Sequence, residues 1–118
     1  MSASRSILLV EDEPLIAMML EDLLDSLGHG IAGTADTVDA ALAQVEGGGF
    51  DLAILDVHLR GGEASWPVAD ALADRGIPFL LASGGGTEIP PPRHAAAPRL
   101  AKPFTMTDVE RALNALAG

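Results

Sequence analysis

Acidic side chains stand at the ends of two short apolar runs in this sequence. Glu11 and Asp12 follow the run Ile7–Val10, and Asp56 ends the run Leu52–Asp56. Clustered carboxylates repel one another unless a cation lies between them, and a ligand set made only of oxygen atoms favours Mg²⁺. A carboxylate beside such a cation can also accept a phosphoryl group. The pattern therefore predicts a magnesium site in which Asp56 is the acceptor of phosphate.

A hydroxyl and an ammonium group follow two further runs. Ser83 comes directly after Ile77–Ala82, and Lys102 directly after Arg99–Ala101. Both groups can bind a phosphoryl oxygen. Each residue also has an ordinary structural interpretation, in which the acids favour helix starts, Ser83 forms a turn and Lys102 is solvated. Because all of these groups fall at run ends, the joint pattern favours one phosphoryl-transfer site.

The three histidines give no comparable signal. His29, His58 and His94 are scattered and lack the spacing of metal ligands. His58 lies two residues after Asp56, and a role as general base is the less favoured alternative for it. Nothing in the sequence suggests a Ser-His-Asp arrangement.

The chemistry-bearing residues must be positioned by an alternation of strands and helices. The apolar runs predict strands at the four sites above and at Ile31–Ala35. Between them we expect helices that start near Pro14, after Thr37 and at Ser65–Pro67, a short or irregular fourth helix after Pro92, and a last helix from Thr107. Alternation of this kind implies an α/β fold with a parallel five-stranded sheet and helices on both faces.

Two helices carry finer predictions. In the first helix, we expect one buried stripe formed by Leu15, Ile16, Met19, Leu20, Leu23, Leu24 and Leu27. At the start of the last helix, Thr107 and Glu110 have the spacing of a capping box.

Length and composition narrow the class of protein. The chain has 118 residues, which suits a single domain over residues 1–118. Its formal net charge of −10 argues against binding nucleic acid or an anionic membrane. No apolar run is long enough for a signal peptide or a membrane span. We therefore expect a cytoplasmic protein.

Four stretches, taken together, resemble the receiver (CheY-like) domain of two-component response regulators. They are Leu8–Glu13, Leu55–Val57, Leu81–Gly84 and Lys102–Phe104. The resemblance covers essentially the whole chain and implies a flavodoxin-like fold with strand order 2-1-3-4-5.

The resemblance also implies a role for each site residue. Asp56 is the expected phosphoacceptor and also a Mg²⁺ ligand. Asp12 is expected as a direct Mg²⁺ ligand and Glu11 as a ligand through water. The backbone carbonyl of His58 is expected as a further ligand. Ser83 takes the place of the switch hydroxyl and Lys102 that of the phosphate-binding lysine.

A closer resemblance is to a group of single-domain receivers of alphaproteobacteria, the FATGUY type. It rests on Pro78–Gly86 and Ser65–Leu72. This chain departs from that pattern at Gly85, where the group has a tyrosine. It also carries Arg99 where receivers usually have an aromatic residue.

These observations predict a single-domain response regulator of a phosphorelay. It is not expected to be an enzyme in the ordinary sense, although it would promote its own phosphorylation and dephosphorylation. Its expected partners are a histidine kinase or histidine phosphotransferase and a downstream regulator protein. On phosphorylation we expect Ser83 to move toward Asp56 and to change a protein-binding face.

Two alternatives remain open. One is a receiver fold used as a phosphorylation-independent binding module. The other is a phosphatase with an Asp nucleophile, which is disfavoured because His58 stands where such enzymes need a second Asp.

Overall fold

The computed structural model describes residues 5–57, 59, 64–83, 92–94, 97–101 and 105–117. Within these residues, strands and helices alternate along the chain as the sequence predicts. The elements are β1 (Ser6–Val10), α1 (Pro14–Ser26), β2 (Gly30–Ala35), α2 (Val38–Gly47), β3 (Leu52–Asp56), α3 (Trp66–Asp74), β4 (Phe79–Ser83), a 3-10 helix (Pro92–His94), β5 (Arg99–Ala101) and α4 (Met106–Ala117).

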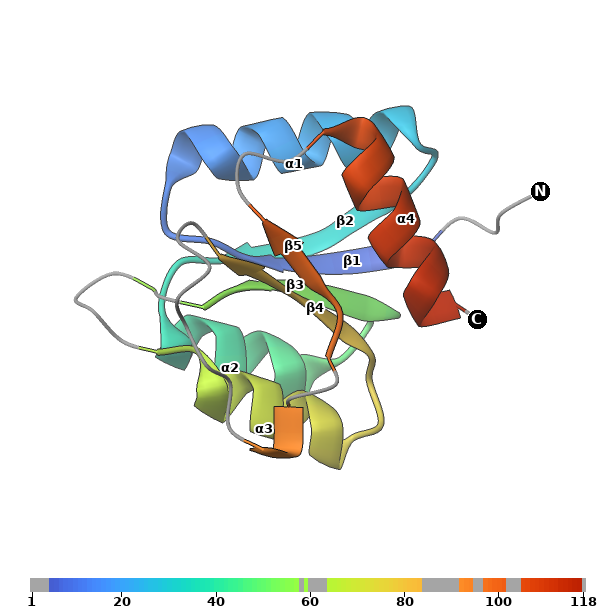
Figure 1. Cartoon of the computed structure of the whole chain (residues 1–118). Coiled ribbons are helices and arrows are strands. Elements are labelled where there is room, and N and C mark those ends of the chain that lie inside the picture. The colour runs from blue at the N-terminus through green and yellow to red at the C-terminus, as the bar shows by residue number, and fades with distance from the viewer. Residues whose placement is uncertain are drawn as a thin grey trace.

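The five strands form one parallel sheet in the order β2-β1-β3-β4-β5, which confirms the predicted topology (Figure 1). The register pairs Val10 with Leu55, Asp56 with Ala82, and Ser83 with Ala101. The carboxyl ends of β1, β3, β4 and β5 therefore meet at one edge of the sheet.

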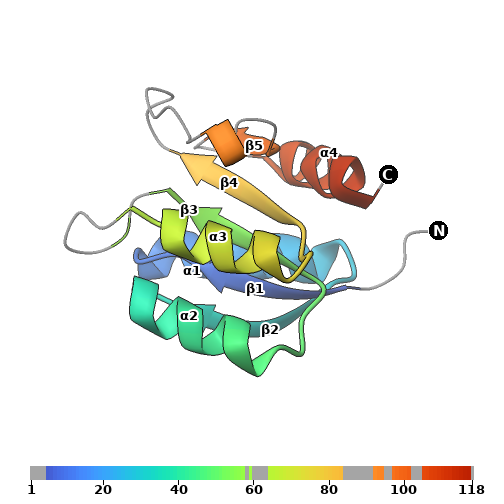
Figure 2. The same cartoon turned by 90° about the horizontal axis from the view of Figure 1, so that it is seen from below.

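Helices cover both faces of the sheet. Helices α1 and α4 lie on one face, and α2 and α3 lie on the other (Figures 1 and 2). Strand β3 is buried along its whole length. Ile54 packs in the core beneath α1 and α4, whereas Ala53 and Leu55 pack beneath α2 and α3. This two-sided burial explains why the run before Asp56 is continuously apolar rather than alternating.

The connection between β4 and β5 contains a short helix, as the sequence predicts, but this helix begins at Pro92 rather than after it, because proline suits the first turn of a helix. It is a single 3-10 turn at Pro92–His94, close to α3 (Figure 1). The buried residue of this turn is His94. His94 therefore makes the buried contact between this turn and the rest of the fold, and Arg93 adds exposed ion pairs to α3.

The predicted buried stripe of α1 is wrong at two of its positions. Leu20 and Leu24 are buried, but Leu15 is 80% exposed and Met19 is 40% exposed. Residues four apart lie one above the other on a helix, and Leu20 and Leu24 form the line that touches the sheet. Leu15 and Met19 lie to one side of this line. The periodic pattern in the sequence is therefore wider than the part of the helix surface that the sheet buries.

The capping box of α4 also differs from the prediction. The Thr105 hydroxyl accepts a hydrogen bond from the Asp108 N–H at 3.2 Å, and an Asp108 carboxylate oxygen accepts one from the Thr105 N–H at 3.0 Å. The predicted pair, Thr107 and Glu110, lies inside the helix instead. Both pairs have the same spacing, so the spacing alone could not distinguish them.

This correction gives a matched pair of variants. Thr105→Ala removes the hydroxyl that accepts the Asp108 N–H, so we expect it to lower the free energy of unfolding by about 1 kcal/mol. Thr107→Ala removes the same atoms from an exposed position within the helix, so we expect a change below about 0.5 kcal/mol. Urea unfolding of the two variants measures the difference. A larger loss for Thr107→Ala would restore the original prediction.

None of the helices in the described part of the chain combines the length and the apolar character that a membrane span requires.

Candidate metal and phosphoacceptor site

Three carboxylates gather at the carboxyl edge of the sheet. Glu11, Asp12 and Asp56 each offer one oxygen atom, and these atoms all lie within 4.8 Å of one another. Opposite ligands of an octahedral Mg²⁺ lie about 4 Å apart, and adjacent ligands lie about 3 Å apart. The spacing and the all-oxygen donor set therefore fit a magnesium ion.

The position of this cluster follows from the pairing of β1 with β3. Glu11 and Asp12 directly follow β1, and Asp56 is the last residue of β3. The backbone is fixed on both sides, since the Glu11 N–H donates to the Ala35 carbonyl at 2.9 Å and the Val57 N–H donates to the Ala82 carbonyl at 3.0 Å. The three acids are therefore held together by the sheet rather than by a mobile loop.

Burial strengthens the mutual repulsion of the three carboxylates. Glu11 is 7% exposed and Asp56 is 8% exposed, whereas Asp12 is half-buried. An oxygen of Glu11 accepts a hydrogen bond from the Asp12 N–H at 3.1 Å. Like charges repel more strongly where solvent is partly excluded. A divalent cation would remove this repulsion, and the half-buried side of Asp12 leaves a route for it to enter.

Of the remaining predicted site residues, the structure places only the backbone of Ser83. This residue is the last of β4, and it pairs with Ala101, the last residue of β5. Ser83 therefore belongs to the same edge of the sheet as Asp56. The side chain of Ser83, and the whole of His58 and Lys102, lie outside the part of the structure that is described.

A pocket of about 430 Å³ beside the carboxylates contains residues that the sequence analysis did not single out. Besides Glu11 and Asp12, its wall includes Glu21, Thr34 and Asp36. Asp36 directly follows the end of β2. The rule that singled out Glu11 and Asp56, a polar side chain at a strand end, would also have found Asp36.

The comparisons with known proteins agree with this geometry. Residues 7–64 match the model of the response regulator receiver domain. The receiver domain of the response regulator PhyR from Erythrobacter litoralis is 32% identical, covers 98% of this chain and is itself covered over 91% of its length, with a TM-score of 0.80. The chain belongs to the response regulator receiver family. Members of this family are signalling proteins that generally bind Mg²⁺ through an acidic cluster.

Two further relatives refine the comparison. SdrG from Sphingomonas melonis Fr1 is 59% identical over the full length of both chains, with a TM-score of 0.89, and the match to SdrG in its BeF3-activated conformation has a TM-score of 0.84. The phyllosphere-induced regulator PhyR of Methylorubrum extorquens is 38% identical over 77 residues. The chain spans 29% of the length of that PhyR.

Proposed function

We propose that this protein is a single-domain response regulator that accepts a phosphoryl group on Asp56. The observation that carries the proposal is the convergence of three carboxylate oxygens within 4.8 Å at the ends of two adjacent strands. Three carboxylate oxygens brought this close together are the ligand set that a divalent cation such as Mg²⁺ prefers. The match to SdrG over the full length of both chains supports the single-domain form. Membership of the FATGUY-type group stays a prediction from the sequence.

In the proposed reaction, an Asp56 oxygen forms a bond to phosphorus while the bond from phosphorus to the donor's leaving atom breaks. That atom is a ring nitrogen in a phosphohistidine donor and a carboxylate oxygen in acetyl phosphate. Glu11 and Asp12, with the His58 carbonyl, would hold the Mg²⁺. When bound, this ion neutralises charge on the phosphoryl oxygens. Lys102 would bind one of those oxygens, and Ser83 would bind another after transfer. Phosphoryl transfer depends mainly on such positioning and charge neutralisation.

Partners follow from the same proposal. Receiver domains act with kinases and with downstream proteins, and we propose a histidine kinase or histidine phosphotransferase as the donor for this chain. A downstream regulator protein would read the phosphorylated state. The cytoplasm stays the predicted location.

Acetyl phosphate tests the reaction without a cognate kinase. We expect the purified protein to gain one phosphoryl group in the presence of Mg²⁺, measured as intact mass. EDTA should prevent the gain, because the carboxylates at Glu11, Asp12 and Asp56 would then repel the donor. Hydroxylamine should remove the group, since it cleaves an acyl phosphate and leaves a phosphoserine intact. A label that resists hydroxylamine would contradict an aspartyl phosphate.

One feature favours a second candidate, a receiver fold that binds proteins without phosphorylation. Arg99, an exposed residue at the start of β5, stands where the family pattern has an aromatic residue. This candidate predicts no mass gain from acetyl phosphate at any Mg²⁺ concentration. The third hypothesis, a phosphatase, predicts turnover of a phosphate ester, so the same preparation distinguishes all three.

A further inference from the structure

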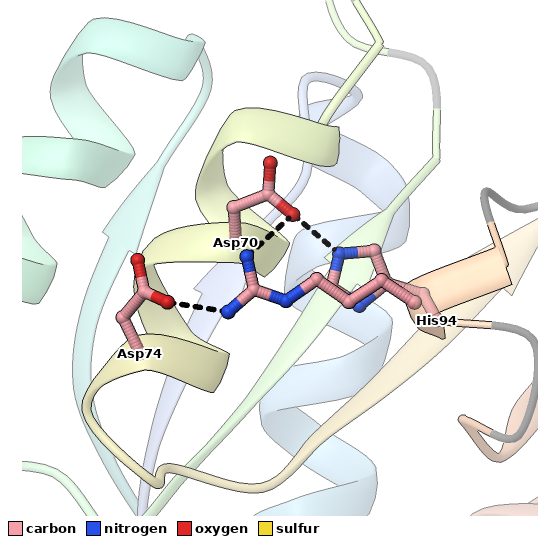
Figure 3. Close-up of polar contacts among 4 residues, drawn as sticks. Asp70, Asp74 and His94 are labelled. Carbon is pink, nitrogen blue, oxygen red and sulfur yellow. Dashed lines mark hydrogen bonds and ion pairs between the residues drawn. The ribbon is translucent and has the colours of Figure 1, made fainter.

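A buried histidine lies outside the carboxylate site, at the end of the 3-10 turn within the β4–β5 connection. His94 is 3% exposed, and its Nε2 lies 2.7 Å from an Asp70 carboxylate oxygen on α3, as Figure 3 shows. Arg93, the preceding residue, makes ion pairs with Asp70 at 3.6 Å and with Asp74. Two successive residues of the 3-10 turn thus attach to one helix.

Two aromatic rings pack against His94. Trp66, the first residue of α3, stacks on the imidazole with ring centroids 6.1 Å apart and an interplanar angle of 12°. Phe79, the first residue of β4, meets the ring edge-on at 5.5 Å and 72°. The imidazole is therefore held by a carboxylate at its edge and by aromatic rings around it. We call Trp66, Asp70 and His94 the latch.

The latch joins two chain connections that both leave the carboxylate edge. One connection starts after Asp56 and ends at Trp66, and the Ser65 N–H donates back to the Val57 carbonyl at 2.9 Å. The other starts after Ser83 and ends at the 3-10 turn. The hydrogen bond between Ser65 and Val57 joins the residue before Trp66 to the residue after Asp56. A shift of the backbone at Asp56 would therefore move the start of α3 and, with it, the latch.

We propose that the latch couples the state of Asp56 to the surface formed by α3 and the 3-10 turn. It holds the turn on α3 while Asp56 is unmodified, and it loosens when a phosphoryl group on Asp56 shifts the hydrogen-bonded backbone of Val57 and Ser65. A tightly packed ring has few intermediate positions, so small shifts at the site become a discrete change here. His94 is a positioning residue in this scheme, and the inference rests on the proposed phosphoryl-accepting function.

Linkage fixes the sign of the effect. If the phosphorylated state loosens the latch, then a weakened latch must favour the phosphorylated state by the same factor. A variant with a weaker latch should thus bind a phosphoryl mimic more tightly. A residue that only stabilised the fold would give no such gain.

The chain supplies its own reporter, because Trp66 is its single tryptophan. An imidazole stacked on an indole quenches its fluorescence. With Mg²⁺ and beryllofluoride, a mimic of the phosphoryl group, we expect Trp66 emission to rise as the stack separates. In Asp70→Asn we expect higher emission before any addition. We also expect half-saturation at a beryllofluoride concentration lower by about fivefold, the small end of typical couplings.

Two further variants test whether the effect is specific to the contact of His94 with Asp70 and Trp66. Arg93→Gln removes the half-exposed partner of Asp70 and leaves His94 in place, so its half-saturation should stay within about twofold of the unmodified protein. His94→Ala removes the ring, and it should show both high starting emission and tighter binding. Circular dichroism confirms that each variant is folded before it is compared.

Fluorine NMR of bound beryllofluoride separates the possible failures. A bound signal without any change in Trp66 emission would overturn the latch and leave the proposed function standing. Equal or weaker binding by folded Asp70→Asn would do the same. The absence of a bound signal in the unmodified protein would overturn the proposed function, and the latch proposal with it.

Discussion

Asp56→Asn is expected to abolish Mg²⁺-dependent labelling by acetyl phosphate. The substitution keeps the size of the side chain but replaces the attacking carboxylate oxygen by an amide, which is a poor nucleophile. It also removes one of the three negative charges that lie within 4.8 Å of one another. Labelling should therefore fall below the detection limit. This loss is much larger than the one expected from replacing a residue that only binds the phosphoryl group.

Asp51→Asn is the matched control for this experiment. Asp51 precedes β3 at the opposite end of the strand, where its carboxylate accepts a hydrogen bond from the Ser6 N–H at 2.8 Å. An asparagine oxygen can accept the same bond, so folding and labelling should both be preserved. Intact mass after treatment with acetyl phosphate measures each protein. Persistent labelling of Asp56→Asn, or its loss in Asp51→Asn, would refute the assignment of the phosphoacceptor.

The carboxylate site could be predicted because the end of each strand is marked by a short sequence pattern at the strand itself. A short apolar run followed by an acid marks both the strand and the residue beyond it, and parallel strands bring such residues to one edge. The positions of Glu11, Asp12 and Asp56 follow from these two facts. The strand order was predicted from the resemblance to receiver domains and not from the apolar runs. No local sequence feature indicates that β1 pairs with both β2 and β3.

Other features depend on contacts that the local sequence does not encode. Thr105 and Thr107 are equivalent by spacing, and only the observed start of α4 at Met106 identifies Thr105 as its cap. Leu15 follows the periodic stripe of α1 but lies beyond the line of contact with the sheet. The stack of His94 on Trp66 joins residues from two separate connections, so no periodicity predicts it. The sequence has few aromatic residues, and nothing in it predicts that His94 is buried against two of them.

The charge cluster has a consequence for stability as well as for binding. Two unit charges about 5 Å apart repel by about 3 kcal/mol at an effective dielectric constant of 20, and solvent around the half-buried Asp12 reduces this to about 1 kcal/mol. Asp12→Asn removes the negative charge of Asp12 and, with it, the repulsion between this charge and those of Glu11 and Asp56. In EDTA we therefore expect the variant to be more stable than the unmodified protein by about 1 kcal/mol, or about 4 °C in Tm.

In the presence of Mg²⁺, the unmodified protein should instead be more stable than Asp12→Asn. The unmodified protein gains stability in proportion to the logarithm of the Mg²⁺ concentration over its Kd. Asp12→Asn loses a charged ligand, so its Kd should rise at least about tenfold and its Tm should respond little to millimolar Mg²⁺. Thermal unfolding in EDTA and in a Mg²⁺ series measures both effects.

Asp36→Asn makes the same change of charge in the neighbouring pocket, on an exposed residue outside the three-carboxylate cluster. It should leave Tm in EDTA almost unchanged and keep the response to Mg²⁺. If Asp36→Asn behaved like Asp12→Asn, net charge rather than a specific site would govern stability. If Asp12→Asn were less stable in EDTA, the carboxylates would not be repelling one another and the case for a cation between them would fail. A site that is unfavourable alone and stabilised by its ion is the arrangement expected where ion binding, rather than folding, is the purpose of the acids.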